Sequence, residues 1–282
     1  MMTAVEALGA DERGVLLGLL CAGVDGSAMA RLAGAGVDRC RAAFEAWAAL
    51  SEGDREAERA ALVAWLEASP PPGLERVHPG WIRRALENEP SALVRAVAGG
   101  LTAEAARVAD ELLRARGDEP DLRGPAPDGP GLRGAHRVLF AALAPMPTAD
   151  HGPPRARALC ALGGAALLDE IDRRGAETLG RALAGAPDAV VARAAAGVGD
   201  PLARVVLAAA RGRESAVARA AARALVAGAP SHDGGAARAI GLHAVARDLA
   251  DEGAAALAAV AQRLPPAVGE ALLACASVAE AG

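Results

Sequence analysis

Residues 200–230 read DPLARVVLAAARGRESAVARAAARALVAGAP, and this stretch decides the fold class of the chain. Ala, Leu and Arg are strong helix formers and fill most of its positions. Gly and Pro interrupt it, which marks tight turns. No run alternates apolar and polar residues with the period of two that a half-buried strand requires. The stretch therefore predicts short helices joined by tight turns.

The remainder of the C-terminal half repeats this pattern, with apolar residues at three- and four-residue steps. We expect helices over Leu159–Ile171, Glu177–Leu183, Ala189–Ala196, Pro201–Ala210, Ser215–Val226, Ala236–Leu249, Gly253–Leu264 and Ala267–Val278. Short helices of similar size favour an all-α fold, a right-handed superhelix of the armadillo or HEAT kind. We expect this fold to form two or three compact helical domains.

One segment marks a boundary between domains. Residues 118–134 read DEPDLRGPAPDGPGLRG and contain four Pro and four Gly, the composition of a linker. The residues before it also carry helical periodicity. We therefore expect an N-terminal helical part over residues 1–117, a linker over 118–134 and a C-terminal helical domain over 135–282.

The composition excludes several classes of protein. Hydrophobic residues make up 52% of the 282 positions and charged residues 23%, which is typical of a globular chain. The net charge is −5 and every basic residue is Arg, whereas a general nucleic-acid binder needs a clear cationic excess. No apolar run reaches the roughly 18 residues of a membrane span. We expect no nucleic-acid partner and no direct membrane insertion.

Motifs for catalysis, cofactors or metals do not occur in the sequence. It lacks HExxH, GxSxG and a phosphate-binding loop, which would require a Lys. The cysteines Cys21, Cys40, Cys160 and Cys275 form no CxxC pair, so we expect most of them to be small core residues. His243 lies in a helical run and is expected at the surface or hydrogen-bonded. We therefore predict no enzyme activity, no cofactor and no metal.

An enzyme that uses a histidine or the acidic cluster Asp169, Glu170 and Asp172 is the alternative to a non-enzymatic chain. Carboxylates this close can share a proton or bind a cation. On a helix, such a cluster is more often a solvated face. Both interpretations remain open at this point.

The segment His78-Pro79-Gly80-Trp81 marks the start of another helix. Trp is a frequent anchor in protein interfaces, so Trp81 is a candidate partner-binding residue. The alternative is a hydrophobic staple, in which the same side chain fixes how the chain enters the helix.

Three stretches together resemble the flagellar motor switch protein FliG, a family of armadillo-like helical proteins. Residues 10–67 are similar to its N-terminal domain, which packs against a membrane-ring protein. His78 and Pro79 match two residues of the family's His-Pro segment, and WIRRALENEPSALVRAVAGGL follows them. In the family, this segment holds the next protein of the rotor ring. The resemblance thus implies that His78, Pro79 and Trp81 contact a partner.

The third stretch, residues 176–209, is similar to the family's C-terminal pattern of helix, Gly-Ala turn, helix, polar turn and torque helix. The matching residues are Leu179, Ala182, Leu183, Gly185 and Ala186. Leu179 and Leu183 are therefore further candidates for partner binding. Ala208 and Ala209 stand where the family has an acidic pair, so the resemblance implies a static scaffold without torque function.

The resemblance implies a non-enzymatic assembly or adaptor protein of a flagellar or type III secretion-type apparatus. Its partners would be ring or export-apparatus proteins, and copies of the chain could associate with one another. Residues 1–14 lack a basic segment followed by a long apolar one, so we expect no signal peptide. The expected location is cytoplasmic, at most peripheral to the inner membrane through a protein partner. The alternative is a generic HEAT- or armadillo-like interaction scaffold.

Overall fold

The computed structural model describes residues 45, 47–68, 76–89, 91–98, 101–117, 143, 153–230 and 232–280. Every regular element in these ranges is helical, and none of the residues within them forms a strand, so the all-α prediction is confirmed. The chain divides into two compact units, Met1–Asp150 and His151–Gly282. The predicted linker over 118–134 and most of the stretch 10–67 lie outside the described residues. The domain boundaries and the superhelical path stay predictions.

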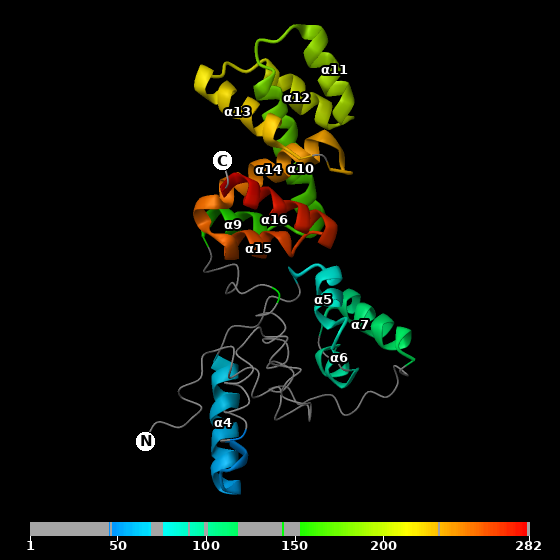
Figure 1. The fold of residues 1–282 in the computed structure, drawn as a ribbon, viewed down its shortest axis with the longest axis vertical. Coiled ribbons are helices and arrows are strands. Elements are labelled where there is room, and N and C mark those ends of the chain that lie inside the picture. Colours follow the sequence, from blue (N-terminus) through cyan, green and yellow to red (C-terminus); the bar gives the residue numbers. More distant parts are fainter. Residues whose placement is uncertain are drawn as a thin grey trace. The chain divides into compact units, whose positions relative to one another are not determined.

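The first unit contains helix α4 (Glu52–Ala68), whose start is fixed by a side-chain cap (Figure 1). The hydroxyl of Ser51 accepts the backbone N–H of Asp54 at 3.3 Å. This bond satisfies one of the N–H groups that the first turn of a helix leaves without a partner.

Three further helices of this unit pack together. Helices α5 (Pro79–Leu86) and α6 (Ser91–Ala98) each contact α7 (Ala103–Ala115). Their apolar positions three and four residues apart close a small core. The buried side chains of this core are Ile82, Leu86, Val94, Val97, Ala105, Ala109, Leu112 and Leu113.

Arg116, which follows α7, joins the end of this helix to the end of α5. Its Nη2 donates to the carbonyl oxygens of Leu86 at 3.0 Å and Glu87 at 2.6 Å. Its Nη1 donates to the carbonyl of Glu89. These carbonyls belong to the last turn of α5 or follow it, where the helix itself supplies no N–H. One planar guanidinium satisfies all three because it presents five N–H groups.

The second unit is built around one long helix, α10 (Gly164–Ala182). The other elements are α9 (Pro154–Cys160), α11 (Asp188–Val198), α12 (Leu202–Ala210), α13 (Ala216–Gly228), α14 (Gly235–Leu249), the 3₁₀ turn η2 (Ala250–Glu252), α15 (Ala254–Ala261) and α16 (Pro266–Glu280). Helices α11–α13 lie toward one end of the unit and α9, α15 and α16 toward the other (Figure 1). Helix α14 is buried almost all round because α10, α13 and α16 pack on it.

Helix α10 corrects one expectation from the sequence. We expected a break between Ile171 and Glu177, but the helix continues through this segment without interruption. Gly175 lies inside it because α14 passes against the backbone there. A Cβ at Gly175 would lie 2.7 Å from the carbonyl carbon of Ala237 and 2.8 Å from the nitrogen of Gly241. The glycine therefore serves a close helix crossing rather than a turn.

A second close approach holds α12 on the same helix. A Cβ at Gly180 would lie 2.6 Å from the Cβ of Ala209. Beside it, Ala176, Ala195 and Val206 form a buried cluster between α10, α11 and α12. Small side chains thus set the distance between α10 and both of its main neighbours.

Candidate interaction surface

His78 and Pro79 form the entry to α5 in the first unit. The Nδ1 of His78 accepts the backbone N–H of Gly80 at 3.1 Å, and Pro79 occupies the first turn, where its missing N–H is not needed. Trp81 is half-buried, and the guanidinium of Arg84 lies 5.4 Å from the centre of its ring. His78 and Pro79 thus cap and start helix α5. Binding of a partner by these three residues stays a prediction.

Burial lowers the pKa of His78 below its ordinary value of 6.5, and the nearby carboxylate of Glu104 opposes this shift. The neutral imidazole is therefore the form that the fold favours. It is also the form that can accept the Gly80 N–H at Nδ1.

Leu179 and Leu183 lie in the second unit, at the end of α10. Leu179 packs against the buried cluster of Ala176, Ala195 and Val206. The backbone N–H of Leu183 closes the last turn by donating to the carbonyl of Leu179 at 3.1 Å. Both leucines are half-buried, and the structure shows a packing role for Leu179. Partner binding by these residues stays a prediction as well.

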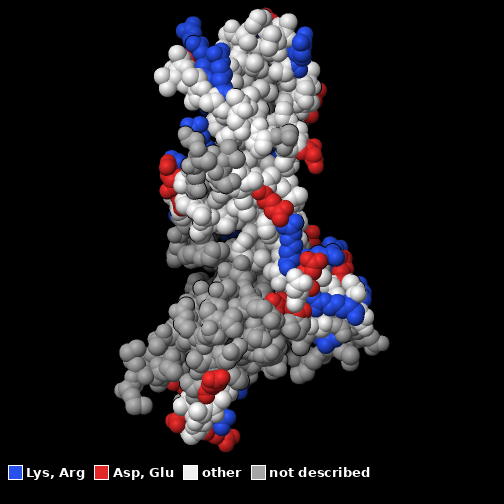
Figure 2. Space-filling view, viewed as in Figure 1, with Lys and Arg blue, Asp and Glu red and all other residues white. Residues whose placement is uncertain are grey.

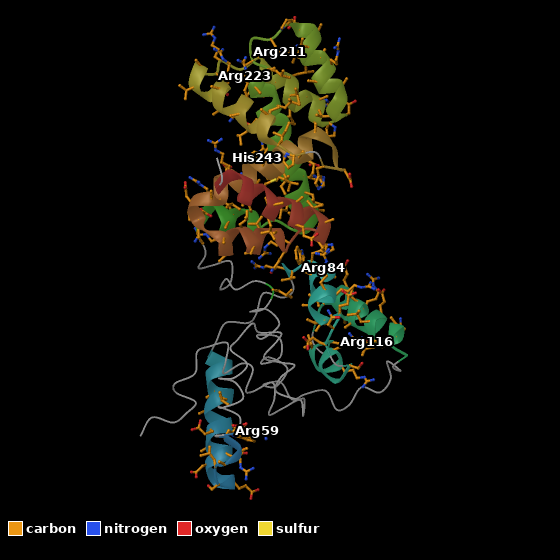
Figure 3. All side chains as sticks on the ribbon, in the orientation of Figure 1. Arg59, Arg84, Arg116, Arg211, Arg223 and His243 are labelled. Carbon is orange, nitrogen blue, oxygen red and sulfur yellow. The ribbon has the colours of Figure 1, made fainter. Side chains whose placement is uncertain are left out.

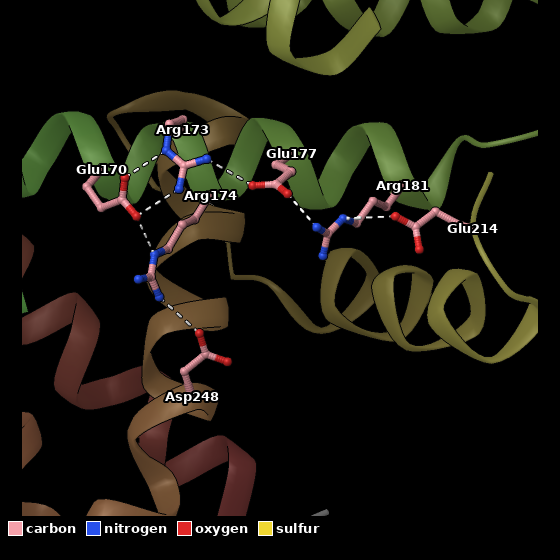
Figure 4. A network of polar contacts seen from close by, with 7 residues as sticks. All are labelled: Glu170, Arg173, Arg174, Glu177, Arg181, Glu214 and Asp248. Atoms are coloured by element: carbon pink, nitrogen blue, oxygen red, sulfur yellow. Dashed lines mark hydrogen bonds and ion pairs between the residues drawn. The ribbon is translucent and has the colours of Figure 1, made fainter. Parts of the chain in front are cut away.

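Two of the three carboxylates of the acidic cluster on α10, Glu170 and Asp172, are engaged in ion pairs. Figure 4 shows those of Glu170. Glu170 accepts from Arg173 at 2.7 and 2.9 Å and from Arg174 at 2.8 Å. These hydrogen bonds lower the pKa of Glu170 to about 2, against the burial that would raise it. Asp172 pairs with Arg238 of α14, with Nη2 donating at 2.6 Å. The carboxylate of Glu170 is therefore held ionised and does not share a proton with its neighbours.

The same network continues along α10 and reaches two other elements. Arg173 donates to Glu177 at 3.0 Å, and Glu177 also pairs with Arg181. Arg181 lies 3.3 Å from a carboxylate oxygen of Glu214, which precedes α13. A separate branch runs from Arg174 to Asp248 of α14 at 3.0 Å. Within the described ranges, no group of three or more His, Cys, Asp or Glu residues is arranged to hold a metal ion.

His243 and the cysteines lie inside the second unit. The side chain of His243 is 8% exposed, and its Nδ1 has no hydrogen-bond partner among the described residues. The expected surface position of His243 was therefore wrong, because α14 is enclosed by its neighbours rather than half-exposed. Cys160 and Cys275 are buried, as predicted, whereas Cys21 and Cys40 lie outside the described residues.

Helix α13 presents an open apolar face, which the sequence did not predict. Ala222 is the one buried residue among its thirteen. Val217 is 79% exposed, and the other exposed large hydrophobic side chain in the described ranges is Val190 of α11, at 46%. Both valines lie at the same end of the unit.

This end of the unit is also basic. Between Arg181 and Pro230 the sequence contains seven Arg and three acidic residues, against a net charge of −5 for the whole chain. Figure 2 shows arginine side chains standing in a largely uncharged surface over α11–α13. No described carboxylate pairs with the side chains of Arg193, Arg204, Arg211, Arg213 or Arg219. The surface therefore offers guanidinium groups whose charge is not neutralised within the described fold.

Arg223 is held in place on α13. Its Nε donates to the carbonyl of Ala182 at the end of α10, at 3.0 Å. Arg211 and Arg223 are seen at the same end of the unit in Figure 3. A signal for this surface exists in the sequence, since residues 215–232 contain two Arg four residues apart and no acidic residue. Alanines occur on all sides of α13, so its sequence does not indicate which face is buried.

No described helix combines the length and the apolar character that crossing a membrane requires. No protein-family model, no curated protein and no solved structure matches the chain.

Proposed function

We propose that the chain is a non-enzymatic assembly or adaptor protein that binds a protein partner through its second unit. The open face of α13 carries this proposal, because Val217 is 79% exposed on a helix with a single buried residue. Exposed apolar surface bordered by charge is typical of protein interaction sites. The ion pairs of Glu170 and Asp172 support a structural role for the acidic cluster, which was the main candidate for chemistry.

A FliG-like component of a flagellar or type III secretion-type ring is the finer proposal. Its support is the order of elements over residues 176–209: the end of α10, a turn at Gly185, α11, a turn at Gly199, and α12. Ala209 on α12 lies against Gly180, so an acidic side chain at this position would face α10 rather than a partner. This supports a scaffold without a torque helix. The partners would be ring or export-apparatus proteins, or further copies of the chain, at a cytoplasmic or peripheral site.

A generic HEAT- or armadillo-like scaffold is the second candidate. The same open face on α13 supports it, because such scaffolds bind unrelated proteins through exposed helices. The packing of α10 on α14, four helices further along the chain, argues against a simple stack in which each repeat contacts only its neighbours. The identity of the partner separates the two candidates.

A photo-cross-linking residue tests the proposal in the native host. The residue p-benzoylphenylalanine is placed at position 217 of the full chain, and at position 190 in a matched control, and cross-linked products are identified by mass spectrometry. The adaptor proposal predicts a protein adduct that is strong at 217 and weak at 190. A ring or export-apparatus protein as the adduct supports the FliG-like proposal, and an unrelated protein supports the generic scaffold. The absence of an adduct at 217 above the level at 190 would overturn binding through α13.

A further inference from the structure

The exposed side of α12 carries two arginines. Arg204 lies in the helix and Arg211 caps its end with helical backbone angles, and both side chains are exposed. They are seven residues apart, which places them within about 20° of each other around the helix axis and about 10.5 Å apart along it. Val206 is buried on the opposite side, roughly 160° from Arg204. Both arginines therefore leave the helix on its solvent side.

No described carboxylate neutralises these arginines. Arg204, Arg211 and Arg213 form no hydrogen bond or ion pair with another described side chain, although Asp200 precedes Arg204 by only four residues. Residues 201–230 contain five Arg and one acidic residue, a net charge of +4. That acidic residue is Glu214, whose carboxylate lies 3.3 Å from Arg181 of α10. The positive charge of this segment is therefore available to a partner.

The packing of α12 and of the turn after it holds this charge in a fixed place. A Cβ at Gly180 of α10 would lie 2.6 Å from the Cβ of Ala209, so α12 lies directly on the backbone of α10. Arg213 belongs to the turn that the pair of Arg181 and Glu214 ties to the end of α10. Arg211 is seen at this end of the unit in Figure 3. A charged surface on such a support loses little entropy when a partner binds.

The residues around the arginines indicate which anion they fit. A guanidinium binds carboxylates and phosphates equally well in a bidentate geometry. Nucleic-acid sites add Lys, Ser, Thr, Asn or Gln contacts to phosphates and aromatic side chains for bases. Residues 201–230 contain one such side chain, Ser215, and its hydroxyl already accepts the N–H of Ala218. Arg within an otherwise apolar surface is typical of protein interfaces, so carboxylates of a protein are favoured.

We propose that Arg204, Arg211 and Arg213 form a binding site for an acidic segment of a partner protein. Carboxylates about 10 Å apart on that segment pair with Arg204 and Arg211, and a further carboxylate pairs with Arg213. This inference rests on the proposed adaptor function, names the chemistry of its partner and extends the contact from α13 to α12. Four residues of chain span at most about 14 Å, so Arg213 lies within that distance of the exposed Val217.

The test uses the full chain and two designed peptides. Each is an amidated, fluorescein-labelled, flexible peptide of about 16 residues. The first alternates Glu with Gly and Ser, and the second has Lys at every Glu position. Fluorescence anisotropy at 150 mM NaCl gives the Kd of each. The net charge of the chain is −5, so a general electrostatic attraction would favour the Lys peptide.

We expect the Glu peptide to bind at least tenfold more tightly than the Lys peptide, and its Kd to rise with salt. The double variant R204E/R211E should weaken the Glu peptide at least tenfold and strengthen the Lys peptide, a reversal that mere loss of structure would not produce. Arg157 of α9 and Arg247 of α14 are also exposed and without a described side-chain partner. R157E/R247E therefore changes the net charge equally and should alter both Kd values by no more than about threefold. Far-UV circular dichroism and thermal melting confirm that both variants fold.

Three results would overturn the proposal. One is equal or tighter binding of the Lys peptide to the unmodified chain, and another is an equal loss of Glu-peptide binding in R157E/R247E. The third is tighter binding of a labelled 20-base-pair DNA duplex than of the Glu peptide, with loss in R204E/R211E, which would identify a phosphate backbone as the ligand.

The outcomes also separate this proposal from the cross-linking result. A protein adduct at position 217 together with failure of the Glu peptide leaves the adaptor function standing and removes the acidic segment. Binding of the Glu peptide that R204E/R211E abolishes, without an adduct at 217, supports the arginine site on α12 and removes binding through α13. Failure of both experiments removes both proposals.

Discussion

Replacing Gly175 by Ala should disrupt the second unit, because this glycine lets α10 and α14 cross with their backbones in contact. The new Cβ would overlap the carbonyl oxygen of Ala237, its nearest neighbour, and would lie 2.7 Å from the carbonyl carbon of the same residue, whereas an ordinary van der Waals contact begins at 3.4 Å. The contact with the carbonyl carbon alone requires the helices to separate by at least 0.7 Å, the difference between these distances, and the closer oxygen requires more. The obstructing atoms belong to the backbone, so no side-chain rotation can relieve the clash.

The cost of this separation follows from packing. Overpacking a core costs about 1–3 kcal/mol, and a gap of roughly 0.5–1 Å also forfeits a quarter to a half of each dispersion contact along the crossing. Alanine gains up to about 1 kcal/mol over glycine in helix propensity, which only partly offsets the loss. We expect the free energy of unfolding to fall by about 3–5 kcal/mol. At a slope of about 2 kcal/mol/M, the urea midpoint falls by about 2 M.

The two units can be followed by different signals. Trp47, Trp65 and Trp81 all lie in the first unit, so tryptophan fluorescence reports on that unit alone. Far-UV circular dichroism reports on the helices of both units. Gly175→Ala should shift part of the circular dichroism transition to lower urea and leave the fluorescence transition in place.

Gly197→Ala provides the matched control for this variant. Gly197 lies in α11, and a Cβ added to it would have no atom within 4 Å, so alanine should stabilise the second unit by about 0.5–1 kcal/mol. A midpoint for Gly175→Ala within about 0.5 M of the unmodified chain would refute the close crossing. So would an equal loss in Gly197→Ala, because that residue has no neighbour to meet.

Three further predictions concern caps. Arg116→Met should destabilise the first unit by about 1–2 kcal/mol by fluorescence-detected urea unfolding, because three carbonyls lose their donor; an equal loss in the neighbouring Arg114→Met would contradict this. Glu252→Gln should cost the second unit about 1 kcal/mol by circular dichroism, because the carboxylate accepts the first N–H groups of α9 at 2.9 and 2.8 Å; Asp251→Asn should change little. Since burial lowers the pKa of His78, the unfolded state binds more protons near its value of 6.5, and stability of the first unit should fall as the pH drops through and below 6.5. His78→Asn keeps a cap acceptor and should remove this dependence of the free energy of unfolding on pH. An unchanged pH dependence in this variant would show that another group causes it.

Most helices of the second unit could be predicted from the sequence because local signals mark their ends. The expected helix Ser215–Val226 corresponds to α13, where the hydroxyl of Ser215 accepts the N–H of Ala218 at 3.1 Å. The expected break before Glu177 was wrong because glycine has two uses. An exposed glycine tends to interrupt a helix, whereas a glycine at a helix crossing lets two backbones approach closely. For Gly175, the position of α14 decides between these two roles.

The candidate surface was less predictable than the fold. His78 and Trp81 stood out because they begin a helix, and the structure indeed gives His78 a capping role. The face of α13 did not stand out because alanine is compatible with both a core and a surface. Its exposure depends on α10 and α14, which cover the opposite side of the helix and come from distant parts of the sequence.

The contacts that position α13 explain why this face can act as a binding surface rather than as a loose helix. Arg181 of α10 holds Glu214 before the helix begins, and Arg223 is fixed to the carbonyl of Ala182 within it. Both contacts lead back to the end of α10, whose own place is set by the crossing at Gly175. A binding site on such a supported helix loses little entropy when a partner docks. Arg181→Met should therefore reduce, but not abolish, the yield of the protein adduct cross-linked at position 217, because Arg181 acts only through the placement of α13. Complete loss of the adduct in a variant that still folds would mean that Arg181 itself contacts the partner.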